Sequence, residues 1–398
     1  MLPKFIRDMK LFGIPLPWLQ LTREKSRLLI ALAGVAFANL LLFIQLGLRD
    51  SLYDTAVQIH RHFRADLVLV NPGVNNLIDI NYPSQGIPRR RLEQVRAFVG
   101  VESVSPLYSA FVVWKNPETQ RSRPLIVFGF EPDKPAFNLP EVTQQLNRLK
   151  LSDVVLFDRA SRSEFGPVAT EFEQGRRIIT EVNNRRIKVG GLFTLGGSIF
   201  SADGLLMTSE LNFRRITARP LNKLSLGLIK LEPGVDAQKV RANLAASLPS
   251  DVSVLTMEDF INLEKQYWQD SSSIGYIFTL GAFLGFIVGS VIVYQVLYSD
   301  VSTHLGEYAT LKAIGYTNNY LLGIVFQEAL LLSILGYIPG FFLSLGGYYL
   351  IAESARLPIA MEFGRALLVF FLTVLMCFLA GVLAVRKLRD ADPADIYS

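Results

Sequence analysis

Two long apolar runs flank the stretch Ser299-Asp-Val-Ser-Thr-His-Leu-Gly-Glu-Tyr-Ala-Thr-Leu-Lys-Ala-Ile-Gly-Tyr-Thr317 near the C-terminal end of the chain. Within it, Leu305, Tyr308 and Ala309 recur at the i, i+3, i+4 spacing of one helical face. Gly315 follows the last apolar turn, where glycine most easily adopts the left-handed conformation that ends a helix. The pattern predicts a short amphipathic helix held between two membrane spans.

Apolar runs long enough to cross a membrane occur four times in the sequence. A span needs about 20 residues, at about 1.5 Å each, to cross a hydrocarbon core of about 30 Å. The first run, Leu28–Leu48, is too long for a signal peptide, and no small-residue cleavage site follows it. Basic residues gather in the N-terminal segment and in the C-terminal tail. The positive-inside rule therefore places both termini of this multi-pass protein in the cytoplasm.

The predicted organisation alternates spans with polar segments. It comprises a cytoplasmic amphipathic segment at 1–27, transmembrane helix 1 at 28–48, an external domain at 49–272, helix 2 at 273–298, a cytoplasmic helix and loop at 299–319, which we call the coupling stretch, helix 3 at 320–352, a short external loop at 353–364, helix 4 at 365–385 and a cytoplasmic tail at 386–398. The predicted fold class is an α-helical membrane protein with four transmembrane helices and a large α+β extracytoplasmic domain between helices 1 and 2.

The external domain has a mixed α+β pattern. Leu224–Leu231, a helical pattern over Ala237–Leu248 and the run Val252–Leu255 predict a strand–helix–strand unit. Asn183-Asn184 separates two strand-like runs and predicts a two-residue hairpin turn, because asparagine tolerates positive φ. We expect two lobes, one α+β lobe from the two ends of the domain and one β-rich lobe at about 121–218.

The composition fits a membrane protein with a sizeable soluble part. The 398 residues are 50% hydrophobic and 19% charged, and the apolar residues are unevenly distributed. The net charge of +5 does not indicate nucleic acid binding, because the basic residues are scattered rather than gathered in one aromatic-interleaved patch. The single cysteine, Cys377, excludes a disulfide within the chain, so the external domain must rely on its own hydrophobic core.

No catalytic, metal-binding or cofactor-binding cluster stands out in the sequence. His60 and His62 have no further metal ligands at useful spacing, which favours a surface role. Asp50 and Asp54, one helical turn apart at the exit of the first span, favour solvated positions. No P-loop motif occurs, so ATP and magnesium would be bound by a partner chain. We therefore expect a subunit that is not an enzyme and has no cofactor of its own.

The helices around the coupling stretch carry three further expectations. The helical pattern Met257–Trp268 leads into the second span, which favours one continuous helix from the external domain into the membrane, either as a moving rod or as a rigid stalk. Glu328 would be costly at the bilayer centre, so we expect it near the inner interface or facing another helix. Close helix packing is expected at four glycines of the third run, Gly336, Gly340, Gly346 and Gly347.

Three stretches resemble FtsX/MacB-type ABC transporter permeases. They are Glu307-Tyr-Ala-Thr-Leu-Lys312-Ala-Ile-Gly315, Gln327-Glu328-Ala-Leu-Leu-Leu-Ser-Ile-Leu-Gly336 and the tail from Arg386 to Tyr397. The resemblance implies that the first is the cytoplasmic coupling helix, which docks on the ATPase. The residues implied in this coupling are Leu305, Gly306, Glu307, Tyr308, Leu311, Lys312, Ala313 and Gly315, with Glu328 at the start of helix 3. Tyr308 stands where the family usually has a basic residue.

Within this family the chain is most similar to the DevC-type permeases of cyanobacterial heterocyst glycolipid exporters. The narrower similarity lies in Pro15-Leu-Pro-Trp-Leu-Gln-Leu and in the Asp392-Pro-Ala-Asp-Ile tail. It implies export of a lipid or glycolipid by a type VII (MacB-like) exporter. The implied partners are a cytoplasmic ABC ATPase, a periplasmic membrane-fusion adaptor, a TolC-like outer-membrane channel, a second copy of the chain and membrane lipid.

Two other functions remain open under the same resemblance. A lipoprotein-releasing permease would take its cargo from the outer leaflet of the membrane. An FtsX-like regulator would switch on a periplasmic cell-wall hydrolase and export nothing. The identity of the partners separates these functions.

Overall fold

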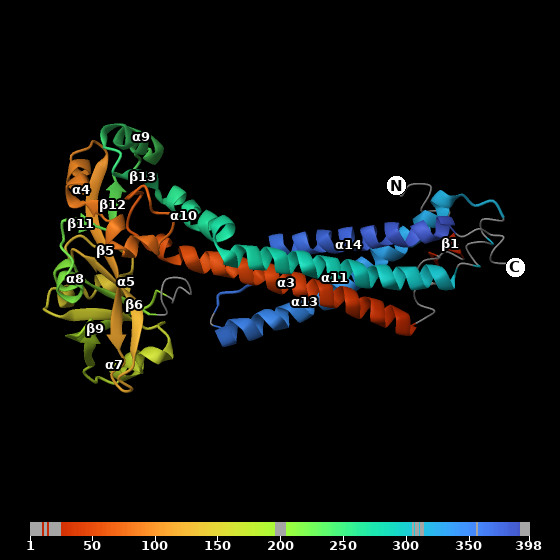
Figure 1. The fold of residues 1–398 in the computed structure, drawn as a ribbon, viewed down its shortest axis with the longest axis horizontal. Helices are drawn as coiled ribbons and strands as arrows, with labels where there is room; N and C mark the ends of the chain where they lie inside the picture. Colours follow the sequence, from red (N-terminus) through yellow and green to blue (C-terminus); the bar gives the residue numbers. More distant parts are fainter. Residues whose placement is uncertain are drawn as a thin grey trace. The chain divides into compact units, whose positions relative to one another are not determined.

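The computed structural model describes residues 10–11, 14–15, 25–195, 204–304, 306, 310, 314–355 and 357–390 (Figure 1). The chain divides into two compact units, which we call the helical unit (Met1–Ser51 with Ser273–Ser398) and the sheet unit (Leu52–Ser272). Most of the expected amphipathic segment at 1–27 and the end of the tail at 391–398 lie outside the described residues. Within the described part, β1 (Lys10–Leu11) pairs antiparallel with β2 (Ile14–Pro15).

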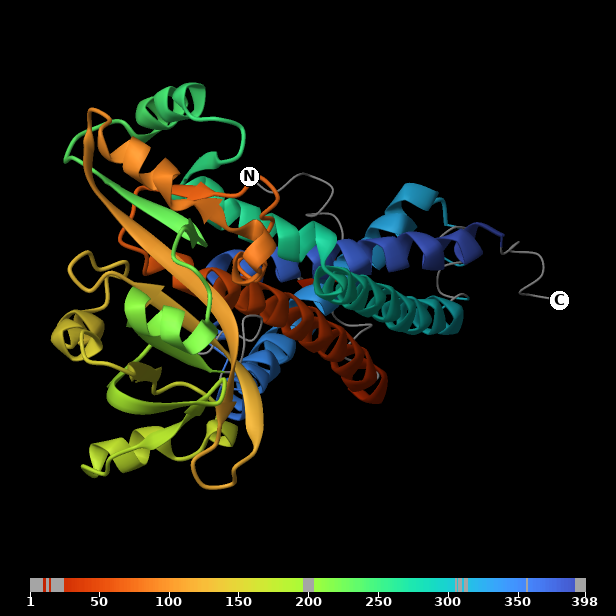
Figure 2. The same ribbon diagram turned by 60° about the vertical axis from the view of Figure 1, so that its left-hand side comes forward.

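Within the described residues, four helices are long and apolar enough to cross a membrane. They are α3 (Lys25–Arg61), α11 (Ser273–Thr303), α13 (Asn318–Ala355) and α14 (Phe363–Asp390). In the helical unit their buried side chains form two apolar clusters that draw on all four helices. Figures 1 and 2 show these helices running alongside one another. Helix α3 extends further beyond its predicted span than the other three helices do, because it continues from residue 48 to Arg61.

Two of the four glycines expected at helix contacts lie close to α3. A Cβ atom would come within 2.6 Å of an α3 side chain at Gly336 and within 2.7 Å at Gly340. Gly346 has no atom within 4 Å of such a Cβ, and the nearest atom at Gly347 is 3.7 Å away. The packing role is therefore confirmed for Gly336 and Gly340, Gly347 is in ordinary contact with α3, and the expectation is wrong for Gly346 among the described residues.

Replacing Gly340 with alanine is expected to lower the free energy of unfolding by about 1–3 kcal/mol, the usual cost of overpacking. The new Cβ would meet the Cβ of Asn39 at 2.7 Å and the carbonyl oxygen of Ala36 at 3.0 Å. Gly346→Ala is the matched control on the same helix, because nothing lies within 4 Å of its Cβ position. Thermal unfolding of the detergent-solubilised chain measures both variants. Equal unfolding temperatures for the two would contradict a close contact at Gly340.

The sheet unit is built on one mixed sheet of nine strands in the order β13-β3-β12-β5-β6-β10-β7-β9-β8. Neighbouring strands are antiparallel except for the parallel pairs β10–β6 and β7–β9. The strands are β3 (Leu67–Val70), β5 (Val101–Lys115), β6 (Ser122–Phe130), β7 (Val154–Asp158), β8 (Ile179–Val182), β9 (Arg185–Phe193), β10 (Leu205–Ser209), β12 (Leu226–Leu231) and β13 (Ser253–Thr256). A separate ribbon pairs β4 (Ile87–Pro88) with β11 (Lys223–Leu224).

The expected division of this domain into two lobes is wrong, because strands from both expected lobes share one sheet. Strand β5 has 15 residues, and its two edges pair with β12 and with β6. Strand β12 comes from the expected α+β lobe, and β6 comes from the expected β-rich lobe. At about 3.3 Å per residue, a strand of this length is long enough to join both sets of strands.

Alternate residues of the central strands face two different apolar clusters, as the two-residue period of a strand requires. In β6, Leu125 and Val127 belong to one cluster, whereas Ile126 and Phe128 belong to the other. The first cluster includes residues of α4 (Arg89–Arg96), α7 (Val168–Glu173), α8 (Glu210–Thr217) and α9 (Ala237–Ser247). The second includes the end of α3, α5 (Pro140–Thr143), α6 (Leu146–Leu149) and α10 (Met257–Gln266).

The local predictions for this domain are confirmed. Strand β12, helix α9 and strand β13 follow one another as the expected strand–helix–strand unit. Strands β8 and β9 pair antiparallel with Val182 opposite Arg185. Asn183 and Asn184 between them have φ angles of 49° and 61°, the positive values that a two-residue hairpin turn of this kind needs.

Candidate functional site

The coupling stretch between α11 and α13 lies partly within the described residues. Its described part makes helical hydrogen bonds, because the Thr310 hydroxyl donates to the carbonyl of Gly306 at 2.8 Å and the Ile314 amide donates to the carbonyl of Thr310 at 3.1 Å. Gly315 has φ of +103°, a value that side chains other than glycine rarely adopt, where the sequence predicts the end of the helix. Six of the predicted coupling residues lie outside the described residues: Leu305, Glu307, Tyr308, Leu311, Lys312 and Ala313.

Apolar side chains are exposed at the end of this stretch. Ile314 is 72% exposed and Tyr316 is 45% exposed. The ring of Tyr316 lies 4.5 Å, centre to centre, from the ring of Tyr320 in the first turn of α13. These side chains fall between the apolar segments Gly275–Thr303 and Gly323–Ser354. Exposed apolar side chains at a polar segment are suited to contact with another protein.

Buried polar groups anchor both ends of the coupling stretch in the helical unit. His304 is 6% exposed, and its amide donates to the carbonyl of Asp300 at 3.1 Å. Its Nδ1 lies 3.6 Å from the Asp300 carboxyl group. Glu328 of α13 is fully buried and faces Asp300 of α11. The structure thus places Glu328 against another helix, beside Asp300 at the start of the coupling stretch.

A second polar cluster of the helical unit joins α3, α13 and α14 around Arg365. The Arg365 side chain is 5% exposed, and its Nε lies 3.1 Å from the Asp50 carboxylate. Its Nη1 donates to the carbonyl of Ala360 at 2.8 Å and to the hydroxyl of Tyr348 at 3.3 Å. The Tyr348 hydroxyl donates to the carbonyl of Phe43 at 2.6 Å. Asp50 is half-buried, with 29% of its side chain exposed, and it also pairs with Arg49 at 2.9 Å. The sequence did not indicate its pairing with Arg365, which arises because α14 begins beside α3.

The expected continuous helix from the external domain into the second span is also wrong. Helix α10 passes into a π-helical turn, η4 (Tyr267–Ser271), and Ser272 then has extended backbone angles of −93° and 143°. The Ser272 amide donates to the carbonyl of Tyr267 at 3.0 Å, and its hydroxyl donates to the carbonyl of Trp268 at 2.7 Å. Three consecutive serines, 271–273, explain the break, because serine side chains compete for backbone hydrogen bonds. Helix α3, by contrast, is unbroken from Lys25 to Arg61.

The sheet unit holds a buried polar cluster near this break. The Glu264 carboxylate is 2% exposed and accepts the amide of Leu77 at 2.6 Å and the indole N–H of Trp268 at 2.8 Å. His60 is fully buried, with its ring 4.6 Å from that of Phe260 and its Nε2 3.6 Å from Glu264. The expected surface role of His60 is wrong, because α3 extends into the sheet unit and α10 covers it. Burial raises the pKa of Glu264 to about 7.

The described residues contain no group of three or more His, Cys, Asp or Glu side chains suited to a metal ion. The sequence signals for the two buried clusters were weak, because each cluster joins residues far apart in the chain. Arg365 is 315 residues from Asp50, and Glu264 is 187 residues from Leu77. Arg365 alone had a local signal, as a charge at the boundary of an apolar run.

Comparison with known proteins adds two family matches. Residues 28–247 match the MacB-like periplasmic core domain, and residues 279–393 match the FtsX-like permease C-terminal region. A search of curated proteins gave no match.

Several solved structures are similar to part of this chain. The periplasmic region of MacB from Actinobacillus actinomycetemcomitans is 13% identical, with a TM-score of 0.36, and covers 54% of this chain and 97% of its own. The extracellular domain of the noncanonic ABC-type transporter YknZ from Gram-positive bacteria is 10% identical, with a TM-score of 0.34, and covers 48% of this chain and 100% of its own. A domain of a putative permease protein from Porphyromonas gingivalis is 16% identical, with a TM-score of 0.29, and covers 48% of this chain and 88% of its own.

Proposed function

Because this chain belongs to the family of the MacB-like periplasmic core domain and carries the FtsX-like permease C-terminal region, we propose that it is the permease subunit of a type VII ABC exporter. Members of this family are ABC transporter permeases, which are generally non-catalytic subunits and work with an ABC ATPase. In the proposal, two copies of the chain lie in the inner membrane with both termini in the cytoplasm. ATP and magnesium are bound by the partner ATPase.

The observation that carries the proposal is the coupling stretch, with its exposed apolar end and its two buried anchors. ATP-driven closure of the ATPase would move Ile314 and its neighbours, and the anchors at Asp300 and Glu328 would pass that movement to α11 and α13. Helix α3 enters the sheet unit without a break, whereas the path through α11 is interrupted at Ser272. We therefore assign the transmission of movement to α3 and a hinge to Ser272.

The cargo in this proposal is a lipid or glycolipid. The resemblance to DevC-type permeases supports this choice, together with the scarcity of charged residues in the apolar runs. A lipid does not need a polar path between the helices. Export would then require a periplasmic membrane-fusion adaptor and a TolC-like outer-membrane channel.

The test is to purify the intact chain from its native membrane in mild detergent and to identify every bound protein by mass spectrometry. Recovery of a P-loop ATPase with a membrane-fusion adaptor is the expected result. Recovery of an ATPase together with a cell-wall hydrolase would show that the chain is part of a regulator and not of an exporter. Recovery of an ATPase together with a lipoprotein-binding partner would favour a lipoprotein-releasing permease. The absence of any ATPase would contradict the assignment of the coupling stretch.

Replacing Ile314 with glutamate is expected to lower the amount of bound ATPase about tenfold, because burying such a side chain is worth about 1.5–3 kcal/mol. The Glu307→Ala, Leu311→Ala double variant should uncouple ATP hydrolysis from transport while the chain stays in the membrane. Val99→Glu is the control, since Val99 is an apolar side chain that is 96% exposed in the sheet unit. Quantitative mass spectrometry of the purified complex measures the bound ATPase in Ile314→Glu and Val99→Glu. For the double variant, the rate of ATP hydrolysis is compared with the rate of transport. If the Ile314→Glu variant retains as much bound ATPase as the original chain, Ile314 does not contribute to the contact with the ATPase.

A further inference from the structure

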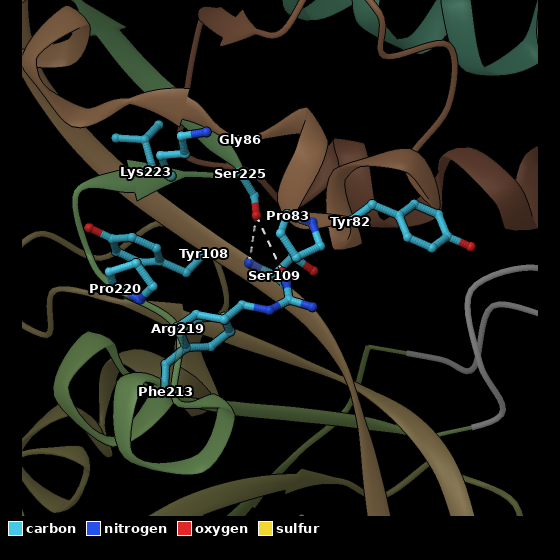
Figure 3. Close-up of a pocket in the computed structure, with 11 residues that line it drawn as sticks. Tyr82, Pro83, Gly86, Tyr108, Ser109, Phe213, Arg219, Pro220, Lys223 and Ser225 are labelled. Atoms are coloured by element: carbon cyan, nitrogen blue, oxygen red, sulfur yellow. Dashed lines mark hydrogen bonds between the residues drawn. The ribbon is translucent and has the colours of Figure 1, made fainter.

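A small cavity in the sheet unit lies between η2 (Pro83–Gln85), β5, α8 and β11 (Figure 3). Its volume is about 90 Å³. Phe213 and Tyr108 give it aromatic walls, and Arg219 and Lys223 give it positive charge. A second, more open hollow adjoins it, because Arg219 and Pro220 line both, and Arg214 adds a third cation there.

Hydrogen bonds hold Arg219 in a fixed position. Its Nη1 donates to the carbonyl of Asn81 at 2.8 Å and to the carbonyl of Ser109 at 3.3 Å. Figure 3 shows the guanidinium beside Ser109 and Pro83. The Ser109 amide is itself held by the Ser225 hydroxyl at 2.9 Å. Since both protons of Nη1 point to carbonyls, the Nε–H and the Nη2 protons remain as a side-by-side pair of donors.

The backbone before Arg219 is strained. Ala218 ends α8 in the left-handed conformation, with φ of 55°. This conformation costs a residue other than glycine about 1–2 kcal/mol. Helices commonly end at a residue in this conformation, although that residue is usually glycine. Here it sets the direction of the chain immediately before the cationic side chain.

The charge of Arg219 is not neutralised by a carboxylate within the described part of the sheet unit. The same is true of Arg214 and Lys223, and no acidic residue lines either hollow. Burial lowers the pKa of the Arg219 guanidinium, which reflects the cost of a cation removed from water. Nearby Arg89 differs, because Glu131 and Glu210 both pair with it. The fold therefore neutralises one half-buried arginine at this place and leaves the charge of the next one without a carboxylate.

We propose that this cavity binds the carboxylate of one acidic side chain from an external partner protein. A carboxylate matches the Nε/Nη2 face of Arg219, on which two parallel N–H···O bonds form. The cavity of about 90 Å³ accommodates a single side chain, and Phe213 and Tyr108 would pack against its methylene groups. All of these groups lie in the sheet unit, so the proposal does not depend on the cargo or on the ATPase.

The probe for the test is acetyl-Ala-Glu-Leu-Ala-amide, whose only charge is its glutamate, with the glutamine peptide as its neutral counterpart. Binding to the full chain in detergent micelles is measured by saturation-transfer NMR at physiological ionic strength. The glutamate peptide is expected to bind, and the glutamine peptide to bind about ten- to a hundredfold more weakly, the factor for a charge-assisted pair. Equal binding of the two peptides, or no binding of either, would overturn the proposal.

Two variants locate the probe. Arg219→Gln is expected to weaken binding of the glutamate peptide about tenfold or more. Lys223→Glu tests the site without touching a buried contact, because Lys223 is exposed, and it should abolish binding by placing a carboxylate at the rim. Arg186→Gln, an exposed arginine on β9 outside both hollows, is the control and should change nothing.

Three outcomes would contradict the proposal at this stage. An equal loss in Arg186→Gln would show general attraction to a basic surface. Unchanged binding in both Arg219→Gln and Lys223→Glu would place the peptide elsewhere. Stronger binding of glycerol phosphate than of the glutamate peptide would make the ligand a lipid headgroup instead of a protein side chain.

Discussion

Replacing Asp50 with alanine is expected to destabilise the helical unit by about 3 kcal/mol, the lower end of the range for leaving a buried charge without its partner. Arg365 would stay buried, with Glu362 as its remaining carboxylate at 3.7 Å. Glu362 is 63% exposed, so it compensates weakly. Unfolding of the detergent-solubilised chain by heat or by sodium dodecyl sulfate measures the effect.

The double variant Asp50→Leu, Arg365→Met separates the ion pair from the packing. Replacing both members of a buried pair by apolar side chains is expected to leave the free energy of unfolding within about 1 kcal/mol of the original. Asp54→Ala is the control on the same helix, because the Asp54–Arg61 pair is 46% and 58% exposed and should contribute less than about 1 kcal/mol. A double variant as unstable as Asp50→Ala would contradict the pairing argument.

The sheet unit is expected to lose about 3 kcal/mol of stability as the pH rises from below 4.5 to above 7, through Glu264 alone. Burial raises the pKa of this carboxyl group from 4.5 to about 7 and outweighs the hydrogen bonds from Trp268 and Leu77, which lower it. The folded chain therefore keeps a proton that the unfolded chain has lost over this interval. Asp79 acts in the same direction as burial, and His60 also faces the group.

Glu264→Gln tests this linkage, because the amide is neutral at every pH. The variant should lose most of the slope of stability between pH 4 and pH 8. Its stability is expected to be lower by a constant amount at every pH, because one amide oxygen replaces two carboxyl oxygens that both accept N–H groups. Glu258→Gln, at an exposed position on the same helix, should leave the slope unchanged. Hydrogen exchange of the sheet unit across this pH range provides the measurement. An unchanged slope in the Gln variant would contradict the assignment of the pH dependence to Glu264.

Features with a short-range pattern could be predicted from the sequence. The four apolar runs lie within helices of the structure, and the Asn183-Asn184 turn has the positive φ angles that its residue types favour. Helix α9 begins at Ala237 as predicted, with Asp236 as its N-cap accepting from the amide of Gln238. Each of these depends on neighbours within a few residues, where periodicity and capping act.

Features that join distant residues could not be predicted. The single sheet depends on both edges of β5, and a strand-like pattern does not say which partners lie beside it. The pairing of Asp50 with Arg365 and the burial of His60 arise when separate helices pack. Arg219 looked like one of many scattered arginines, because its carbonyl partners come from Asn81 and Ser109. The prediction of the coupling residues rested on family resemblance and remains a prediction for the six residues outside the described part.

The two strands that connect the sheet unit to the rest of the chain are neighbours. Strand β3 follows α3 and β13 precedes α10, and they pair with Leu67 opposite Thr256 and Val70 opposite Ser253. The chain thus leaves for the external domain and returns from it at adjacent points. A domain whose two ends are adjacent can be inserted between two membrane spans without requiring a minimum distance between those spans. In evolutionary terms, recombination could exchange or enlarge such a domain while the helices and the coupling stretch were inherited unchanged.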